Sequence, residues 1–148
     1  MTTPAPPPRI QINAVCVIGH RNQPLYIRGF GTTGYDQLHF NYVAHISVDI
    51  IEERLSGGKT TDLYLGLLHA AEDYAVYGYV TNTRVKFLLV IQLADFLVKD
   101  AEIKAVFRRI HQAYVNLTCN PFYDPEGNTM ISNKSFLKAV EDIVVRST

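Results

Sequence analysis

The sequence predicts an α+β fold in which an antiparallel sheet is covered by helices on both faces. Runs of β-branched and aromatic residues are joined by links of only a few residues. Such links favour antiparallel neighbours, because a parallel crossover needs a dozen residues or more. Three other segments repeat their apolar residues at helical spacing. The central strands carry apolar residues at both sets of alternating positions, so both faces should be covered, in the order β-β-α-β-β-β-α-α.

The chain should begin with a tail and continue as one domain. Residues 1–9 hold four of the seven prolines, which predicts an extended, disordered segment. Residues 10–148 are long enough for a single core. The first strand should start at Ile10, and the second should span 25–30. About four turn residues separate them, which is typical of a hairpin.

A helix should follow from Leu38 to Ser56, where two glycines end it. The residues expected to face the sheet are Val43, Ile46, Ile50 and Ile51. The polar stripe on the opposite side consists of Asn41, His45, Asp49 and Glu53.

Three strands should then form a meander over residues 62–70, 74–82 and 84–93. A regular amphipathic helix should begin near Asp100 and end before Asn120-Pro121. Its expected buried residues are Ile103, Val106, Phe107, Ile110, Tyr114 and Leu117. A last helix should follow, with Ser132 as its N-terminal cap.

Composition excludes several classes of function. Lys plus Arg and Asp plus Glu both number 14, so no basic excess exists to bind nucleic acid. The longest apolar stretch, residues 87–98, is too short to span a membrane and contains Asp95. No signal peptide is evident, and Cys16 and Cys119 are too few for a disulfide framework, which favours the cytosol. No nucleophile elbow, P-loop or HExxH motif is present, so neither an enzyme nor a cofactor site is expected.

Residues 29–34, GFGTTG, match the dinucleotide-binding pattern G-x-G-x-x-G, and Asp49 follows the first glycine by 20 residues. That pattern requires a strand, a tight turn and a helix within a parallel unit. Here it follows a hairpin, and Asp49 falls inside a helix. A connecting loop is therefore the favoured interpretation. A small-ligand site, for a nucleotide here or a lipid in the core, remains an alternative.

Two further motifs have a structural and a functional interpretation. His45 and Asp49, four residues apart on a helix, could share a metal or form a proton relay. A polar stripe that is solvated or contacts a partner is favoured, so His45, Asp49 and Glu53 are candidate partner-binding residues. The second motif lies between two helices. Its residues should form a structural turn with aromatics available for packing, rather than a sorting signal: Asn120, Pro121, Phe122 and Tyr123.

Several segments together resemble the sedlin family of small subunits of the TRAPP vesicle-tethering complex. They are PLYIRGF, HFNYVAHISVDIIEER, YLGLLHAAEDYAVYGYVTNTRVKFLLV and CNPFYDPEG, within about residues 12–146. The resemblance implies a longin fold, with a five-stranded antiparallel sheet, the first helix on one face and the last two on the other. The sequence departs from the family pattern in the proline-rich tail, in GFGTTG and in DFLV at 95–98.

The resemblance also implies a function without catalysis. Members of the family help to assemble an exchange factor for Rab-type GTPases in ER-to-Golgi, Golgi and endosomal traffic. The expected partners are other TRAPP subunits and, indirectly, a Rab-family GTPase. The expected location is cytoplasmic, peripheral at Golgi, ER-Golgi intermediate and endosomal membranes through the complex. Asp49 matches an acidic residue of the family's first helix associated with partner contact, and residues 120–123 match its NPFY turn.

The longin architecture is shared by other trafficking proteins, which leaves a second kind of binding module open. These are the longin domain of a SNARE and the small chain of a clathrin adaptor. A SNARE would carry a heptad-bearing helix and an anchor after the domain, and neither is found before Thr148.

Overall fold

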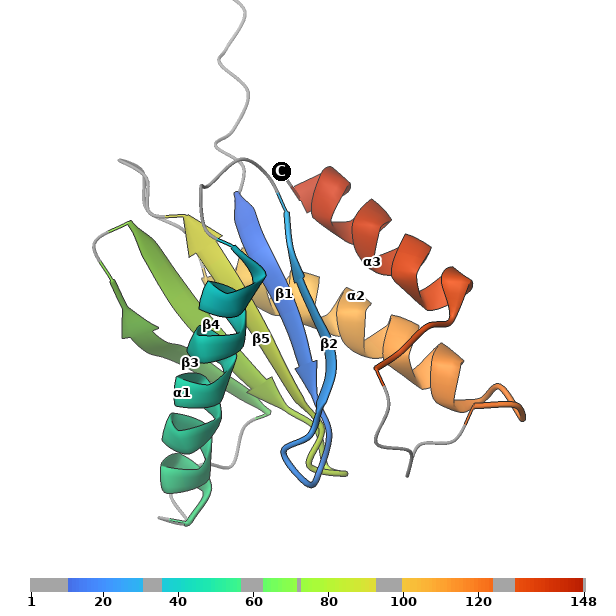
Figure 1. Ribbon diagram of the computed structural model, residues 1–148, viewed down its shortest axis with the longest axis horizontal. Helices are drawn as coiled ribbons and strands as arrows, with labels where there is room; N and C mark the ends of the chain where they lie inside the picture. Colours follow the sequence, from blue (N-terminus) through green and yellow to red (C-terminus); the bar gives the residue numbers. More distant parts are fainter. Residues whose placement is uncertain are drawn as a thin grey trace, which may run out of the picture.

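The computed structural model describes residues 11–30, 36–56, 63–71, 73–92, 100–123 and 130–147. It contains eight elements in the predicted order (Figure 1). They are β1 (Ile12–Ile18), β2 (Pro24–Gly29), α1 (Gln37–Ser56), β3 (Tyr64–Ala70), β4 (Tyr74–Val80), β5 (Lys86–Gln92), α2 (Asp100–Thr118) and α3 (Lys134–Ser147). The expectations for the tail at 1–9, for residues 31–34 of GFGTTG and for DFLV at 95–98 lie outside the described residues.

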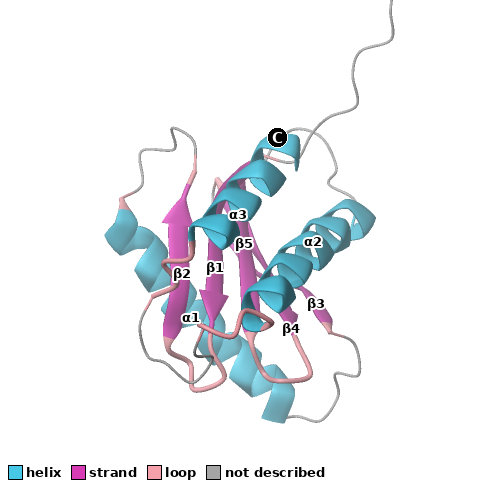
Figure 2. Cartoon of the chain, turned by 90° about the vertical axis from the view of Figure 1, so that its right-hand side faces the viewer, coloured by secondary structure: helices cyan, strands magenta, loops and turns pink. Residues whose placement is uncertain are grey.

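The five strands form one sheet in the order β2-β1-β5-β4-β3, and every neighbouring pair is antiparallel. The β1–β2 hairpin and the β3–β4–β5 meander are joined by the pairing of β1 with β5. Helix α1 lies on one face and α2 and α3 on the other (Figure 2). The α+β, longin-like fold class and the arrangement of one helix against two are therefore confirmed.

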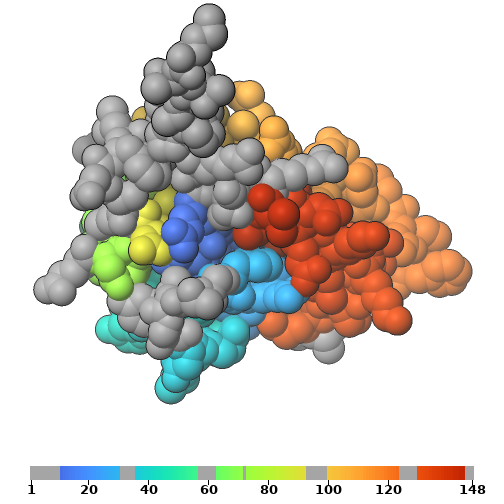
Figure 3. All heavy atoms as spheres, turned by 90° about the horizontal axis from the view of Figure 1, so that it is seen from above, coloured from blue at the N-terminus to red at the C-terminus, as the bar shows by residue number. Residues whose placement is uncertain are grey.

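The central strands β1 and β5 are buried on both faces. All seven residues of β1 are buried, and alternate side chains enter different cores. Ala14, Cys16 and Ile18 face α1, whereas Val15 and Val17 face α2 and α3. Seen from above, the atoms of α1 and those of α3 lie on opposite sides of these strands (Figure 3). Burial raises the pKa of the Cys16 thiol to about 12, so this side chain acts as a small apolar group.

Helix α1 begins after Asp36, whose Oδ1 accepts a hydrogen bond from the His39 N–H at 2.9 Å. Its buried residues are Phe40, Val43, Ala44, Ser47, Val48 and Ile51. Ile50 is half-buried and packs against this core as predicted, whereas Ile46 is half-buried and is not among the residues packed against it, so the prediction was wrong for Ile46. Small Ala44 and Ser47 occupy the contact with the sheet instead, and a pattern read from large apolar residues cannot detect them.

Helices α2 and α3 cover the other face together. The six residues predicted for the buried face of α2 are all buried. The predicted cap of α3 was wrong by one residue. Asn133, not Ser132, precedes the first helical residue, and its Oδ1 accepts a hydrogen bond from the Phe136 N–H at 3.0 Å. Both residue types cap helices well, so the sequence alone could not separate them.

Candidate interaction surface on helix α1

The face of α1 that points away from the sheet carries a line of exposed side chains, called here the outer stripe. It consists of Leu38, Tyr42, His45, Asp49 and Glu53. Leu38 is 74% exposed and Tyr42 is 64% exposed. The stripe is thus apolar in its N-terminal half and acidic in its C-terminal half. A helix face with no role beyond solvation does not need two large apolar side chains in water.

The acidic half of the stripe consists of the exposed carboxylates of Asp49 and Glu53. Within the described part of the chain, neither Asp49 nor Glu53 forms an ion pair. They are four residues apart, so their like charges oppose helix formation by about 0.2–0.5 kcal/mol. Glu53 also lies near the C-terminal end of α1, where the helix dipole disfavours an anion. These carboxylates are therefore available to a cationic partner.

The neighbouring Glu52 has a different role, because it pairs with a buried lysine. Lys86 is 1% exposed, and its Nζ lies 3.0 Å from Glu52 Oε1. The same Nζ donates a hydrogen bond to Asn22 Oδ1 at 2.6 Å. The hydrogen bond from Lys86 is the main reason that the pKa of Glu52 is lowered. Lys86 thus links α1 to the β1–β2 turn.

A groove of about 510 Å³ lies between α1 and the β1–β2 hairpin and is called here the α1–β2 groove. Apolar side chains from both elements line it, and Met130, which is 49% exposed, also contributes. His45 and Asp49 line the α1 side of the groove, whereas Glu53 is not among its lining residues. The structure therefore brings two of the three predicted partner-binding residues together beside an apolar depression.

Side chains of α1 also donate hydrogen bonds to backbone carbonyls of both edge strands. At β2, the amide of Gln37 donates to the carbonyl of Ile27 at 2.9 Å. At β3, the guanidinium of Arg54 donates to the carbonyls of Leu65 and Leu67 at 2.8 and 2.9 Å. Covered edges resist the addition of a further strand. These contacts leave fewer free carbonyls at the two sheet edges for a partner strand.

The NPFY segment forms a turn after α2. Asn120 Oδ1 accepts a hydrogen bond from the Phe122 N–H, and the carbonyl of Asn120 accepts one from the Tyr123 N–H, both at 3.0 Å. Pro121 occupies the position between them. Tyr123 packs against the core, but Phe122 is 95% exposed. Of the two aromatics expected to be available for packing, Tyr123 thus packs and Phe122 lies in solvent.

The GFGTTG match has a structural explanation at its first glycine. A Cβ on Gly29 would overlap the ring of Phe40, so the close approach of this ring favours a residue without a side chain. The strand before it is an antiparallel edge strand. The next described helix has the Asp36 carboxylate at its N-terminus, where a phosphate would otherwise bind. Asp49 is exposed in the middle of α1. The geometry of a dinucleotide site is absent from these described residues.

The described residues were also compared with the metal site and the membrane span considered from the sequence. They contain no group of three His, Cys, Asp or Glu side chains that could hold a metal ion. None of the described helices is long and apolar enough to cross a bilayer.

Comparison with known proteins gives one consistent family. The family described as Sedlin matches residues 17–146. A Xenopus tropicalis protein is 43% identical over 139 residues, covering 89% of this chain and 97% of its own length. A Bos taurus protein is 41% identical over 140 residues, covering 90% and 98%. A Dictyostelium discoideum protein is 41% identical over 138 residues, covering 90% and 96%. All three bear the name "Trafficking protein particle complex subunit 2-like protein". The chain therefore belongs to the sedlin family.

Proposed function

We propose that this protein is a non-enzymatic adaptor subunit of a trafficking protein particle (TRAPP) complex and that it binds a neighbouring subunit through the outer stripe of α1. The names of its relatives support the complex. The observation that carries the surface is that exposed Leu38 and Tyr42 share one helix face with the carboxylates of Asp49 and Glu53, which form no ion pair with another described residue.

The chemistry of the stripe indicates what the partner should offer. An apolar patch would cover Leu38 and Tyr42, because aromatic side chains at the centre of an interface supply much of its binding energy. Lys or Arg side chains would face Asp49 and Glu53. Contacts between charges at the rim of an interface act mainly on association rate and on salt dependence. Binding should therefore weaken as ionic strength rises.

Within the complex, the protein would support vesicle tethering and nucleotide exchange on a Rab-family GTPase in ER-to-Golgi, Golgi and endosomal traffic. It would contribute binding surface and no catalytic group. It would be cytoplasmic and would reach Golgi, ER-Golgi intermediate and endosomal membranes only through its partners. An exchange assay on the assembled complex, with and without this subunit, tests that role.

The direct test is reconstitution with the other TRAPP subunits of the same organism. Asp49→Lys should lower the affinity for one subunit about tenfold or more, because a repulsive contact replaces an attractive one. Asp142→Lys is the matched control, since Asp142 is an exposed aspartate on α3, across the sheet from α1. Incorporation of the Asp49→Lys protein at wild-type affinity would refute the proposed surface. Recovery of no TRAPP subunit with the wild-type protein at low salt would refute the proposed function.

A further inference from the structure

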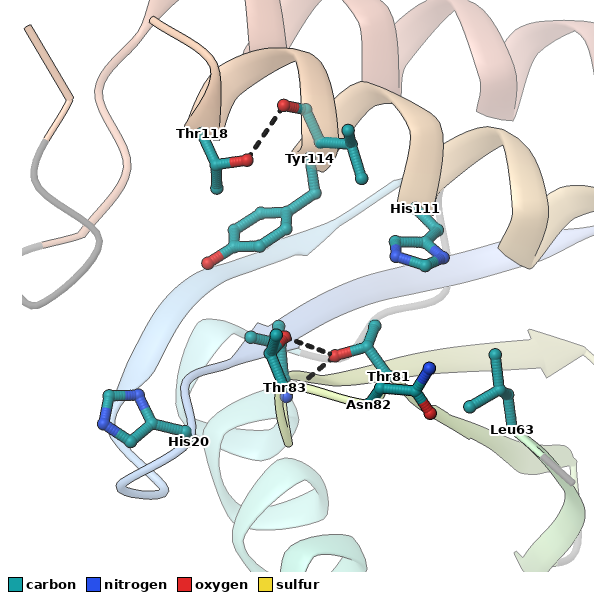
Figure 4. Close-up of a pocket in the computed structure, with 10 residues that line it drawn as sticks. His20, Leu63, Thr81, Asn82, Thr83, His111, Tyr114 and Thr118 are labelled. Atoms are coloured by element: carbon teal, nitrogen blue, oxygen red, sulfur yellow. Dashed lines mark hydrogen bonds between the residues drawn. The ribbon is translucent and has the colours of Figure 1, made fainter. Parts of the chain in front are cut away.

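A second cavity, of about 520 Å³, lies on the opposite face of the sheet and is called here the α2 pocket. It opens between the C-terminal half of α2 and the turn that joins β4 to β5 (Figure 4). His20, from the β1–β2 turn, lies at one end, and Leu63 lies at the other. The pocket shares no described lining residue with the α1–β2 groove, so it is independent of the proposed partner surface.

The β4–β5 turn forms a rigid wall of this pocket. The Thr81 hydroxyl accepts a hydrogen bond from the Val85 N–H at 3.1 Å and lies 2.9 Å from the hydroxyl of Thr83. The Thr81 N–H donates to the carbonyl of Val85 at 2.9 Å, and the Arg84 N–H donates to the carbonyl of Thr81 at 3.0 Å. Because these bonds close the turn on itself, the wall is formed before any ligand arrives.

Helix α2 forms the other wall with two rings held by packing. The His111 imidazole lies 5.7 Å from the rings of both Tyr79 and Phe87, measured between centroids. The Tyr114 ring meets Phe87 edge to face at 5.8 Å. Burial lowers the pKa of His111, so the imidazole is neutral at pH 7 and carries one donor and one acceptor nitrogen. Its one hydrogen bond with a described residue is long, 3.4 Å from Nδ1 to the Tyr79 hydroxyl.

The lining determines which ligands the pocket can accept. Among the ten described lining residues there is no Asp, Glu, Lys or Arg. Leu63, Val85 and Val115 supply apolar surface, and Asn82 and His111 supply hydrogen-bonding groups without charge. A charged ligand would lose part of its hydration here without gaining an opposite charge, which disfavours its binding. The size lies within the usual range for small-molecule sites, roughly 300–1,000 Å³.

We propose that the α2 pocket binds an uncharged small molecule with an apolar body and one hydroxyl or amide group that hydrogen-bonds with His111 or Asn82. Preformed, mainly apolar pockets with a few polar groups are the usual form of such sites.

Three probes with the same ring and different charge test the proposal: p-cresol, 4-methylbenzoate and 4-methylbenzylamine. Each is titrated into the full-length, ¹⁵N-labelled protein, and amide chemical shifts are followed. We expect p-cresol to cause saturable shifts at residues 81–85 and 111–118. The two charged probes should bind about tenfold more weakly or not at all, because the pocket does not compensate their desolvation.

Two variants separate binding in the pocket from binding elsewhere. Asn82→Trp should abolish the p-cresol shifts by filling the pocket, since Asn82 is exposed and its side chain forms no hydrogen bond with the described residues. Ser135→Trp, on the separate groove between α2 and α3, should leave them unchanged. Val115→Trp replaces Asn82→Trp if that variant lowers the thermal midpoint. Three outcomes would overturn the proposal: no saturable shifts with p-cresol, equal affinity for the charged probes, or p-cresol binding that survives a filled pocket.

Discussion

Helix α1 and helix α2 cover opposite faces of the same sheet, yet their exposed sides differ in kind. The exposed side of α2 is mostly polar or small, with Ala101, Glu102, Arg108, Arg109, Gln112 and Asn116 in water and Val115 at 38% exposure. The exposed side of α1 presents Leu38, Tyr42 and the carboxylates of Asp49 and Glu53, which pair with no charge in the described part of the chain. Folding explains α2, because its apolar residues are inside and its polar residues outside. Folding alone does not explain the exposed apolar residues of α1, and this difference supports the proposal that α1 contacts a partner.

The largest expected effect is on the free energy of unfolding, and it is measured by replacing one aromatic residue from each helix. Phe107 is 0% exposed and stacks on Tyr79 at 5.4 Å, so Phe107→Ala should lower the free energy of unfolding by about 3–5 kcal/mol. Tyr42→Ala should change it by less than about 0.5 kcal/mol. Denaturant titrations followed by circular dichroism measure both. Similar losses in the two variants would show that Tyr42 is part of the fold, and the comparison between the helices would fail.

The second effect concerns the packing of α1 on β2. Gly29→Ala should destabilise the protein by about 1–3 kcal/mol, because the new methyl group overlaps the Phe40 ring. Adding Phe40→Leu should restore part of that loss, because a smaller side chain makes room for the methyl group. If the loss came from backbone strain instead, Phe40→Leu would not restore it.

The thermal midpoint of the wild-type protein should stay constant with NAD or GTP, since a ligand that binds only the folded protein would raise it. A rise with either nucleotide would revive the dinucleotide interpretation of GFGTTG.

A smaller effect depends on pH and concerns Glu52. Its pKa is below the ordinary value of 4.5 in the folded protein, so the Lys86 contact stabilises the fold above pH 4.5. That contribution should disappear as the pH falls through the lowered pKa. Glu52→Gln should therefore cost up to about 1 kcal/mol at neutral pH, allowing for solvent screening, and nothing in stronger acid. Glu53→Gln is the control, and an equal pH-dependent loss there would contradict the role given to Lys86.

The smallest effect on stability belongs to Asp49. Asp49→Tyr should leave the thermal midpoint within about 2 °C of wild type, because the side chain is exposed and its removal relieves repulsion with Glu53. The same variant should weaken one partner contact. Asp142→Tyr, on α3, should affect neither property. A collapse of the midpoint in Asp49→Tyr would instead show a structural role for Asp49.

Much of the fold followed from local patterns. Short links between apolar runs indicated antiparallel pairs, and the spacing of Ile103, Phe107 and Ile110 placed the buried side of α2 correctly. Errors arose where neighbouring residues are chemically similar. Ser132 and Asn133 are both good caps, and only the hydrogen bond to the Phe136 N–H decides between them.

The interaction surface was only partly predictable. The polar stripe containing His45 and Asp49 followed from helical periodicity, but the apolar groove beside it did not. That groove requires α1 to lie against a hairpin whose residues precede it by about twenty positions. The exposure of Phe122 could not be predicted from the sequence either, since an aromatic residue beside a turn is usually expected to pack.

By itself, the sequence determined the fold class, the order of the elements and the acidic character of the first helix, because these depend on the spacing of neighbouring residues. Only the tertiary structure decided that β1 pairs with β5, that Lys86 is buried between Asn22 and Glu52, and that the α2 pocket has no charged residue among its described walls. Each of these features joins residues far apart in the chain. Their contacts are set by how the helices pack on a twisted sheet, and no local pattern records that geometry.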